Sequence, residues 1–300
     1  MNANKTIFID IEVDFVSKKV FDIGAVTENG REFHSKSLSA FSDFLRGNKY
    51  ICGHNIFNHD LKYLEKEIIK SDVKYFIDTL YFSPLLFPKK PYHSLVKDDK
   101  LTTDELNNPL NDAKKACDLF NDEIAAFKTL EEQLQQIYYC LLKDQIEFKD
   151  FFHYIGYKNT EQNVSVLIRN FFDGIICENA PVEKMANKYS VELAYALSQI
   201  NVIKYDSLTP PWVLKNYPKV ENILNFLRSR NCQSCVYCKE TLNETKALKR
   251  YFNYDNFRSY DGIPLQKSAV KAAVDGKSIL VVFPTGGGKS ITFQLPADGW

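Results

Sequence analysis

The first third of the chain carries short apolar runs with the spacing of a sheet covered by helices. Residues 5–13 (KTIFIDIEV) read as a buried strand, and residues 19–27 (KVFDIGAVT) read as its hairpin partner after a short turn. Residues 50–53 read as another short strand, followed by a helix over about 60–70. A further amphipathic helix is expected over 110–128. The pattern predicts one α/β domain in about 120 residues.

The pattern becomes helical from about residue 124. Apolar residues then recur at helical spacing in three stretches: Leu130, Leu134, Ile137 and Leu141; Val164, Leu167, Ile168 and Phe171; and Leu193, Ala196, Leu197 and Ile200. Such stripes usually form the packed face of a helix, so they predict a helical accessory domain and suggest no chemistry. The Thr-Pro-Pro-Trp run at 209–212 predicts a rigid connection.

The last part of the chain predicts the beginning of a second α/β unit. Residues 278–290 read SILVVFPTGGGKS, which predicts an apolar strand over 278–283, a glycine-rich turn and a helix that starts at Lys-Ser. We therefore divide the chain into four segments: 1–123, 124–230, a cysteine-rich stretch at 231–250, and 251–300.

Composition is that of an ordinary globular protein and excludes several classes. The 300 residues are 45% hydrophobic and 25% charged, with a net charge of zero, so any nucleic-acid binding must depend on local sites. The seven cysteines are odd in number, which favours reduced thiols over a disulfide framework. No apolar run approaches the roughly 18 residues that span a bilayer, and the N-terminus has no secretory core. A cytoplasmic protein is expected.

The glycine-rich turn has the chemistry of a phosphate-binding loop. Glycines let backbone N–H groups curl around phosphate oxygens, and the following helix N-terminus favours negative charge. Lys289 can reach the β- and γ-phosphates, and the Ser290 hydroxyl can take a position on Mg²⁺. The expected nucleotide-binding residues of this loop are Thr285, Gly286, Gly287, Gly288, Lys289 and Ser290.

Residues 257–297 resemble the first motifs of RecQ-type superfamily 2 DNA helicases. The Pro-Thr-Gly-Gly-Gly-Lys-Ser string and the following Phe-Gln-Leu-Pro are typical of that family, which often has no glycine at the first loop position, here Phe283. The resemblance implies ATP with Mg²⁺ as cofactor, DNA as partner, and Gln266 as the residue that reads adenine. The acidic motif and second lobe that hydrolysis requires do not follow before Trp300. We expect the N-terminal part of a longer protein, unable by itself to hydrolyse ATP efficiently or to unwind DNA.

Four acidic residues near the front suggest a metal site. Asp10 and Glu12 lie two apart on a strand, so both side chains point to one face. Burying two carboxylates together is costly unless cations compensate. Asp60 falls at a strand-to-helix junction within GHNIFNHDL, and Asp112 falls early in a helix, after an Ile-Asp-Thr-Leu stretch at 77–80.

These motifs over residues 5–122 resemble the DnaQ-like (DEDD) 3′–5′ exonucleases, which have an RNase H-like fold. The resemblance implies that Asp10, Glu12, Asp60 and Asp112 bind two Mg²⁺ or Mn²⁺ ions, with Asp10 bridging them. The implied reaction is phosphodiester hydrolysis at single-stranded DNA or 3′ ends, in which one metal activates water and the other stabilises the leaving oxygen.

The chain departs from this family at the general base. The family has a histidine five positions before the last acid or a tyrosine four before it, and these positions are Asn107 and Asn108. Asparagine cannot accept a proton, and losing a general base costs about 10²- to 10⁴-fold in rate. Tyr92 or His93 is a candidate substitute, whereas His34 is expected to be a surface or hydrogen-bonded residue.

Cys232, Cys235 and Cys238 form a C-x2-C-x2-C pattern, which suggests Zn²⁺ or an iron–sulfur cluster. We favour zinc as a small structural brace, and three free thiols are the alternative. A complete site needs a fourth ligand, for which the candidates are Cys177, Cys140 or a residue after Trp300.

The sequence as a whole favours a nuclease–helicase fusion in DNA repair, recombination or defence against foreign DNA. In a second interpretation, motivated by Asn107 and Asn108, the front domain binds a DNA 3′ end without cleaving it. A third interpretation is a P-loop ATPase unrelated to DNA.

Overall fold

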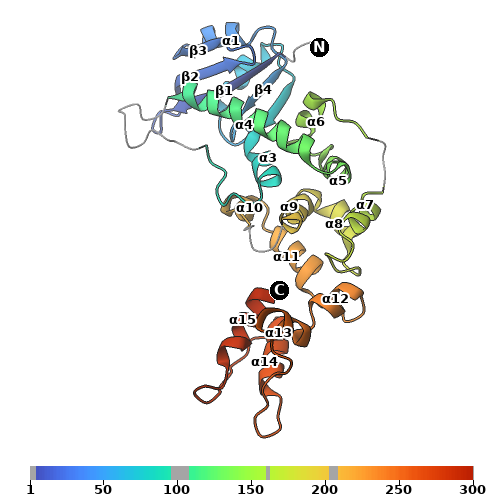
Figure 1. The fold of residues 1–300 in the computed structure, drawn as a ribbon. Helices are drawn as coiled ribbons and strands as arrows, with labels where there is room; N and C mark the ends of the chain where they lie inside the picture. Colours follow the sequence, from blue (N-terminus) through green and yellow to red (C-terminus); the bar gives the residue numbers. More distant parts are fainter. Residues whose placement is uncertain (1–4, 96–107, 160–162, 203–208, 300) are drawn as a thin grey trace. The chain divides into compact units, whose positions relative to one another are not determined.

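The computed structural model describes residues 5–95, 108–159, 163–202 and 209–299 (Figure 1). Contacts divide the chain into two compact units. The first consists of residues 1–162 and 190–218, and the second of residues 163–189 and 219–300. No helix in the described part of the chain has the length and apolar character needed to cross a membrane.

The first unit contains a mixed five-stranded sheet in the order β3-β2-β1-β4-β5 (Figure 1). Its strands are β1 (Thr6–Val13), β2 (Val20–Thr27), β3 (Glu32–Ser35), β4 (Tyr50–Gly53) and β5 (Tyr75–Asp78). Strand β2 runs antiparallel to β1 and β3, whereas β4 runs parallel to β1 and β5. The connections to the parallel strands contain α1 (Leu38–Leu45) and α2 (Leu61–Ile69), because a parallel pair needs a crossover. The predicted α/β architecture is confirmed, as are the predicted strands over 5–13, 19–27 and 50–53.

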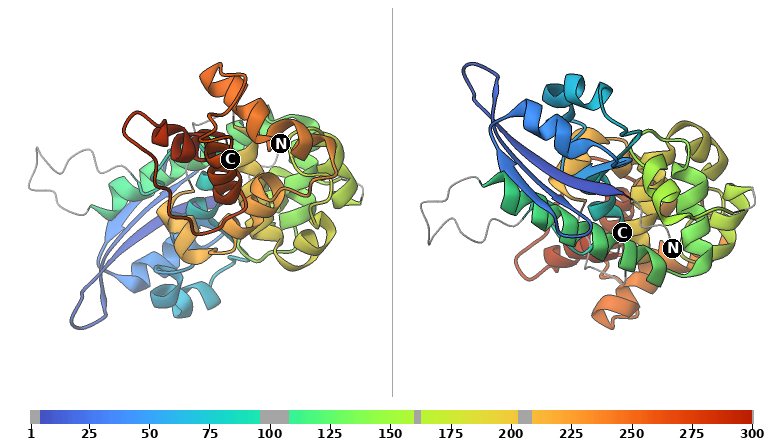
Figure 2. Two further views of the ribbon diagram at one scale, coloured as in Figure 1. Left: turned by 90° about the horizontal axis from the view of Figure 1, so that it is seen from below. Right: turned by 90° about the horizontal axis from the view of Figure 1, so that it is seen from above.

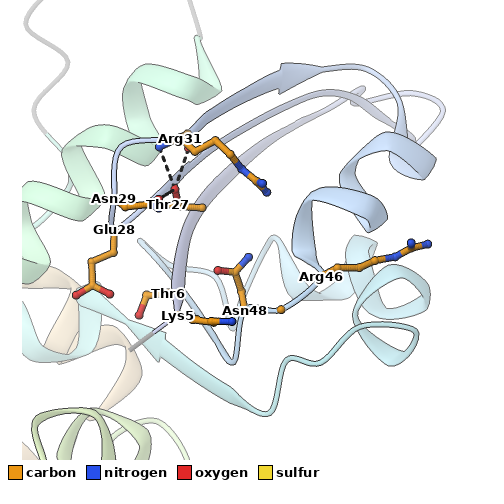
Figure 3. A pocket seen from close by; sticks show the side chains of 9 residues that line it. Lys5, Thr6, Thr27, Glu28, Asn29, Arg31, Arg46 and Asn48 are labelled. Atoms are coloured by element: carbon orange, nitrogen blue, oxygen red, sulfur yellow. Dashed lines mark hydrogen bonds between the residues drawn. The ribbon is translucent and has the colours of Figure 1, made fainter. Parts of the chain in front are cut away.

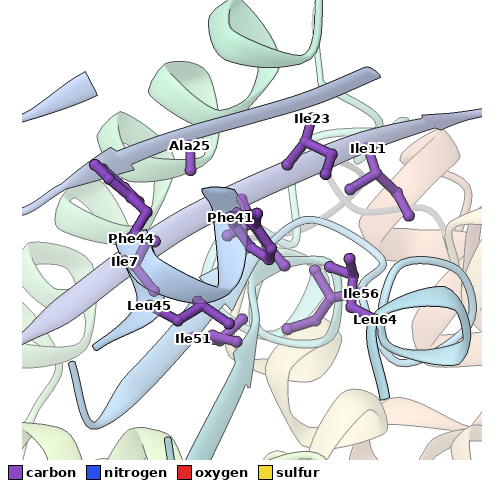
Figure 4. Packing of buried hydrophobic residues seen from close by; sticks show 11 residues of the cluster. Ile7, Ile11, Ile23, Ala25, Phe41, Phe44, Leu45, Ile51, Ile56 and Leu64 are labelled. Atoms are coloured by element: carbon purple, nitrogen blue, oxygen red, sulfur yellow. The ribbon is translucent and has the colours of Figure 1, made fainter. Parts of the chain in front are cut away.

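Alternation along β1 gives the sheet two different faces. Ile7, Ile9 and Ile11 point to one face and form a core with β2, β4, α1 and α2 (Figure 4). Each fully buried side chain of this kind contributes about 1.5–3 kcal/mol. On the other face, Phe8 packs against Phe120 of α4 (Pro109–Thr129), with ring centroids 5.7 Å apart. Because side chains alternate, Asp10 and Glu12 lie on the α4 face of β1.

Further helices of the first unit bury an aromatic core. They are α3 (Thr79–Leu86), α5 (Glu132–Leu142), α6 (Lys149–Ile155), α9 (Ser190–Asn201) and α10 (Pro211–Asn216). Phe82 of α3 stacks on Phe151 of α6, with ring centroids 4.1 Å apart. The Tyr195 hydroxyl of α9 donates a hydrogen bond to the carbonyl of Tyr81 at 2.9 Å.

This grouping differs from the division expected from the sequence. Residue 123 lies inside α4, and α5 and α9 belong to the same compact unit as the sheet. Helical periodicity shows that one face is buried, but it does not show which elements cover that face.

The second unit is helical in its described part. It contains α7 (Val164–Phe171), α8 (Val182–Lys188), α11 (Val220–Leu224), the π-helix η1 (Asn225–Ser229), α12 (Val236–Thr241), α13 (Glu244–Phe252), α14 (Leu265–Val274) and α15 (Lys289–Gly299). Figure 2 gives two further views of all these elements. A small core of Ala247, Leu248, Val270 and Leu295 joins α13, α14 and α15.

The strand predicted over 278–283 is not formed. Leu280 and Val282 are 91% and 80% exposed, and within the described residues of this unit no strand lies beside them. A strand requires a neighbour for its backbone hydrogen bonds, so an apolar run alone does not make one. The helix predicted to start at Lys289 is present as α15.

Candidate functional site

The carboxyl end of β1 carries Asp10 and Glu12 past the end of β4. The two strands pair only from Thr6 to Phe8, so the next residues of β1 have no β4 partner. Asp60 occupies that edge, since its Oδ1 accepts a hydrogen bond from the Ile11 N–H at 3.0 Å. Ile11 lies between Asp10 and Glu12 in the sequence, so this bond fixes the Asp60 carboxylate at their level on the strand.

The loop that delivers Asp60 is organised by a fifth acid, Asp78. This fully buried side chain accepts hydrogen bonds from the backbone N–H groups of Asn55 at 2.7 Å, Phe57 at 3.1 Å and Leu80 at 3.0 Å. It thereby caps α3 and holds the turn that leaves β4. The sequence signal was the Ile-Asp-Thr-Leu motif, although Asp78 was not among the expected site residues.

Asp112 reaches the same end of β1 through α4. The Asn108 side chain caps this helix by accepting from the N–H groups of Leu110 at 3.0 Å and Asn111 at 3.3 Å. Gly24 is the register partner of Asp10, and a Cβ added to Gly24 would lie 2.0 Å from the Leu110 nitrogen. The first turn of α4, which includes Asp112, therefore rests directly on the strand pair at Asp10. The sequence interpretation missed Gly24, and the available signal was a glycine inside a strand.

The four predicted acids thus gather at one end of the sheet, but they do not form a closed cage around one point. Among the described residues, ligand atoms of three or more metal-binding side chains lie within 4.8 Å of one another only at a cysteine group. A two-metal site does not require such a cage, because each ion uses only some of the acids.

Burial makes this end of the sheet favourable for a cation. It raises the pKa of Asp60, because a charged carboxylate loses hydration there, while the neighbouring His59 imidazole opposes the rise. The Nδ1 of His59 lies 3.6 Å from Asp60 Oδ2, and this interaction raises the pKa of His59. Burial also raises the pKa of Asp78 to about 7, against three backbone N–H groups that favour its charged form.

The positions expected for a general base are only partly described. Asn108 is the cap of α4, and Asn107 lies outside the described residues. His93 is buried, with its Nδ1 2.8 Å from Ser83 Oγ, and burial lowers its pKa to about 4. With His54, Tyr92 and Trp212 it lines a pocket of about 280 Å³. His34 Nε2 lies 3.0 Å from Asp22 Oδ2 at the surface, which agrees with the expectation of a surface or hydrogen-bonded residue.

A larger pocket, of about 360 Å³, lies where β1 begins (Figure 3). Its lining includes Lys5, Arg31 and Arg46, and the Arg31 N–H donates to Thr27 Oγ1 at 3.0 Å. It therefore lies at the opposite end of β1 from Glu12, and no predicted site residue lines it.

The phosphate loop of the second unit has the predicted turn followed by a helix. Gly286 and Gly288 have φ of 77° and 68°, which side-chain-bearing residues rarely adopt. Arg258 Nη1 donates to the Gly286 carbonyl at 2.8 Å, and the Tyr260 hydroxyl donates to the Gly287 carbonyl. Lys289 and Ser290 then open α15.

Gln266 contributes a contact that the sequence did not indicate. Its side chain is 1% exposed, its Nε2 donates to the Gly288 carbonyl at 2.9 Å, and its Oε1 accepts from the Arg258 N–H at 2.9 Å. The amide therefore ties the loop to the segment around Arg258.

The C-x2-C-x2-C cysteines meet a fourth cysteine. The sulfur atoms of Cys177, Cys232, Cys235 and Cys238 all lie within 4.8 Å of one another. Cys177 comes from the connection between α7 and α8, whereas Cys140, the other candidate, belongs to α5 in the first unit.

Comparison with known proteins gives similarity to RecQ-family helicases. No family model matches the chain, and no solved structure matches it. It is 49% identical over 51 residues to rat ATP-dependent DNA helicase Q5, covering 17% of this chain and 5% of that protein. It is 44% identical over 59 residues to ATP-dependent DNA helicase RecQ of Synechocystis, covering 20% of this chain and 11% of that protein. A longer similarity, 26% identical over 214 residues, relates 69% of the chain to 14% of fission yeast ATP-dependent DNA helicase hus2/rqh1.

These similarities support a RecQ-like helicase portion in this chain. The chain spans only about a twentieth of the length of the rat relative. The similarities do not show an exonuclease domain.

Proposed function

We propose that this chain is part of a nuclease–helicase fusion that acts on DNA. The first unit is a metal-dependent 3′–5′ exonuclease, and the second carries the ATP-binding start of a RecQ-like motor. The nuclease part of this proposal is supported by the location of four acids at one end of β1, namely Asp10, Glu12, Asp60 and Asp112.

The acids fit a pair of hard divalent cations. All four offer carboxylate oxygens, the ligands that Mg²⁺ and Mn²⁺ prefer. Asp60 and Asp112 are 2% and 9% exposed, and bound cations would offset part of the cost of keeping buried carboxylates charged. The mixed sheet with helices on both faces agrees with the α/β fold that the DnaQ-like resemblance implies.

Each acid has a role in this mechanism. Asp10 would bind both ions, and Glu12, Asp60 and Asp112 would hold them from the strand, from the loop after β4 and from α4. When bound, the ions supply an activated water and stabilise the leaving 3′ oxygen of the DNA strand. Asp78 and Gly24 are positioning residues, because they fix the Asp60 loop and α4 without being metal ligands.

The second unit binds ATP with Mg²⁺ in the same proposal. The N–H groups of the glycine loop would bind the phosphates, Lys289 would contact the β- and γ-phosphates, and the Ser290 hydroxyl would be a ligand of Mg²⁺. The contacts of Arg258, Tyr260 and Gln266 with the loop carbonyls stabilise the turn. The printed names of the relatives, which are ATP-dependent DNA helicases, agree with this role.

A nuclease assay tests the proposal. Single-stranded DNA labelled at its 3′ end is incubated with the protein and Mg²⁺ or Mn²⁺, and the released label is followed. We expect release by the wild type and a loss of at least about 100-fold in Asp10→Ala, as for removal of a catalytic group. Asp14→Ala is the matched control, because Asp14 is an exposed acid just beyond β1.

One specific observation favours a second function, a non-cleaving module that binds DNA 3′ ends. Asn108 serves as the cap of α4 and cannot accept a proton from water. If the wild type binds the labelled DNA but releases no label in this assay, the result would support the non-cleaving module and contradict the nuclease.

A further inference from the structure

We propose that Cys177, Cys232, Cys235 and Cys238 bind a single Zn²⁺ through four thiolates. The ion fastens the connection between α7 and α8 to the segment that precedes the phosphate loop. Cys177 lies 55 positions before Cys232 in the sequence (232 − 177), yet its sulfur joins the other three within 4.8 Å. Four sulfur atoms converging from two separate segments form a complete ligand set for structural zinc.

The sulfur separations fit one tetrahedral ion. A Zn–S bond of about 2.3 Å places the sulfur atoms of a tetrahedron about 3.8 Å apart. The sulfur atoms of Cys177 and Cys235 are 3.9 Å apart. A disulfide would bring two sulfurs to about 2.05 Å, and all seven cysteines are unbridged. An iron–sulfur cluster binds its thiolates through different irons, which requires wider spacing than this group has.

The turn of the three clustered cysteines is shaped to aim their sulfurs at one point. Gln233, between Cys232 and Cys235, has a φ of 61°, a conformation that is unfavourable for a residue with a side chain. Backbone N–H groups also point to the sulfurs: that of Cys235 to Cys232 Sγ at 3.4 Å and that of Cys238 to Cys235 Sγ at 3.4 Å. Such donors stabilise thiolates and orient them as metal ligands.

The segment around Cys177 is held against this turn independently of any sulfur. The Cys177 N–H donates to the carbonyl of Leu227 at 2.7 Å, and Glu178 Oε1 accepts from the Val236 N–H at 3.0 Å. Asn179 Nδ2 donates to Ser234 Oγ at 2.9 Å, within the turn itself. The fourth ligand is therefore positioned by its own backbone and neighbours.

The site is largely enclosed. Cys177, Cys235 and Cys238 are buried, at 2%, 4% and 1% exposure, whereas Cys232 is partly exposed. A pocket of about 270 Å³ lies against two of the four ligand residues and is lined by Cys177, Cys232, Asn179 and Arg230 among others. Enclosed thiolates with four ligands are typical of structural rather than catalytic zinc.

Metal analysis and X-ray absorption at the zinc edge test the proposal on the 300-residue chain. We expect about one zinc per chain and a shell of four sulfurs at about 2.3 Å. Cys177→Ser should lose most of the zinc or show a three-sulfur shell. Cys140→Ser is the matched control, since Cys140 is a partly buried cysteine in α5, and it should keep the full content.

A second measurement needs no variant and covers the case in which Cys177→Ser fails to fold. A mercury-based thiol reagent is titrated into the wild type beside a colorimetric zinc indicator, and zinc release should accompany modification of four thiols. Iron with acid-labile sulfide, a wild type that holds no metal, or a four-sulfur zinc shell in Cys177→Ser would each overturn the proposal.

Discussion

Gly24 is the position where a single methyl group should separate the sheet from Asp112. A Cβ added there would lie 2.0 Å from the Leu110 nitrogen and 2.1 Å from the Pro109 carbonyl carbon. Ordinary contact begins at 3.4 Å, so Gly24→Ala must move the first turn of α4 by about 1.4 Å (3.4 − 2.0). Asp112 lies in that turn and moves with it, away from Asp10.

Both stability and activity should respond to this displacement. Overpacking of a rigid contact costs about 1–3 kcal/mol in the free energy of unfolding. Misplacement of a catalytic group by about 1 Å can cost about 100-fold in rate. We therefore expect a lower urea midpoint and a nuclease rate reduced at least about 100-fold on 3′-labelled single-stranded DNA.

Gly30→Ala separates the two effects. Gly30 has a φ of 81° and nothing within 4 Å of an added Cβ, so alanine there introduces backbone strain of about 1–2 kcal/mol without touching α4. This variant should be destabilised but should keep its nuclease rate. A Gly24→Ala protein with wild-type stability and wild-type rate would refute the reasoning from close packing. Loss of stability with an unchanged rate would refute the proposed role of Asp112.

Two further predictions concern buried charge and the phosphate loop. Glu123 is fully buried, neither of its carboxyl oxygens has a hydrogen-bond partner among the described residues, and burial raises its pKa well above 4.5. The folded protein keeps the Glu123 proton at pH values where the unfolded chain has lost it. The stability that this group contributes is therefore fully present below pH 4.5 and is lost, by about 1.4 kcal/mol per pH unit, as pH rises through the folded pKa. Glu123→Gln should make the slope in urea unfolding shallower by that amount, with Asp60 and Asp78 accounting for the rest, and equal slopes in the two proteins would contradict the assignment. Lys289→Ala should weaken binding of a fluorescent ATP analogue with Mg²⁺ by roughly 10- to 100-fold, because a charge-assisted hydrogen bond contributes about 1.5–3 kcal/mol. Lys277→Ala, which removes an exposed lysine near Asp275, should bind as the wild type does, and equal affinity of all three proteins would argue against phosphate binding at this loop.

The sequence by itself determined the local elements and the residues that carry chemistry. The apolar run in residues 5–13 predicted the strand, and the two-residue spacing of Asp10 and Glu12 predicted their common face, because side chains of a strand alternate. The glycine string predicted the turn before Lys289, since Gly286 and Gly288 adopt positive φ. Both features depend on interactions within a few residues.

The tertiary structure decided which of these residues meet. Asp60 reaches β1 only because β4 ends early and leaves the Ile11 N–H for its carboxylate. Cys177 joins the other cysteines through backbone contacts with Leu227, which no spacing rule indicates. Residues 278–283 show the converse case: their apolar pattern predicted a strand, but no strand of the described part of the chain lies beside them to pair with. Periodicity reports which side of an element is apolar, whereas packing and hydrogen bonds between distant segments decide what covers that side.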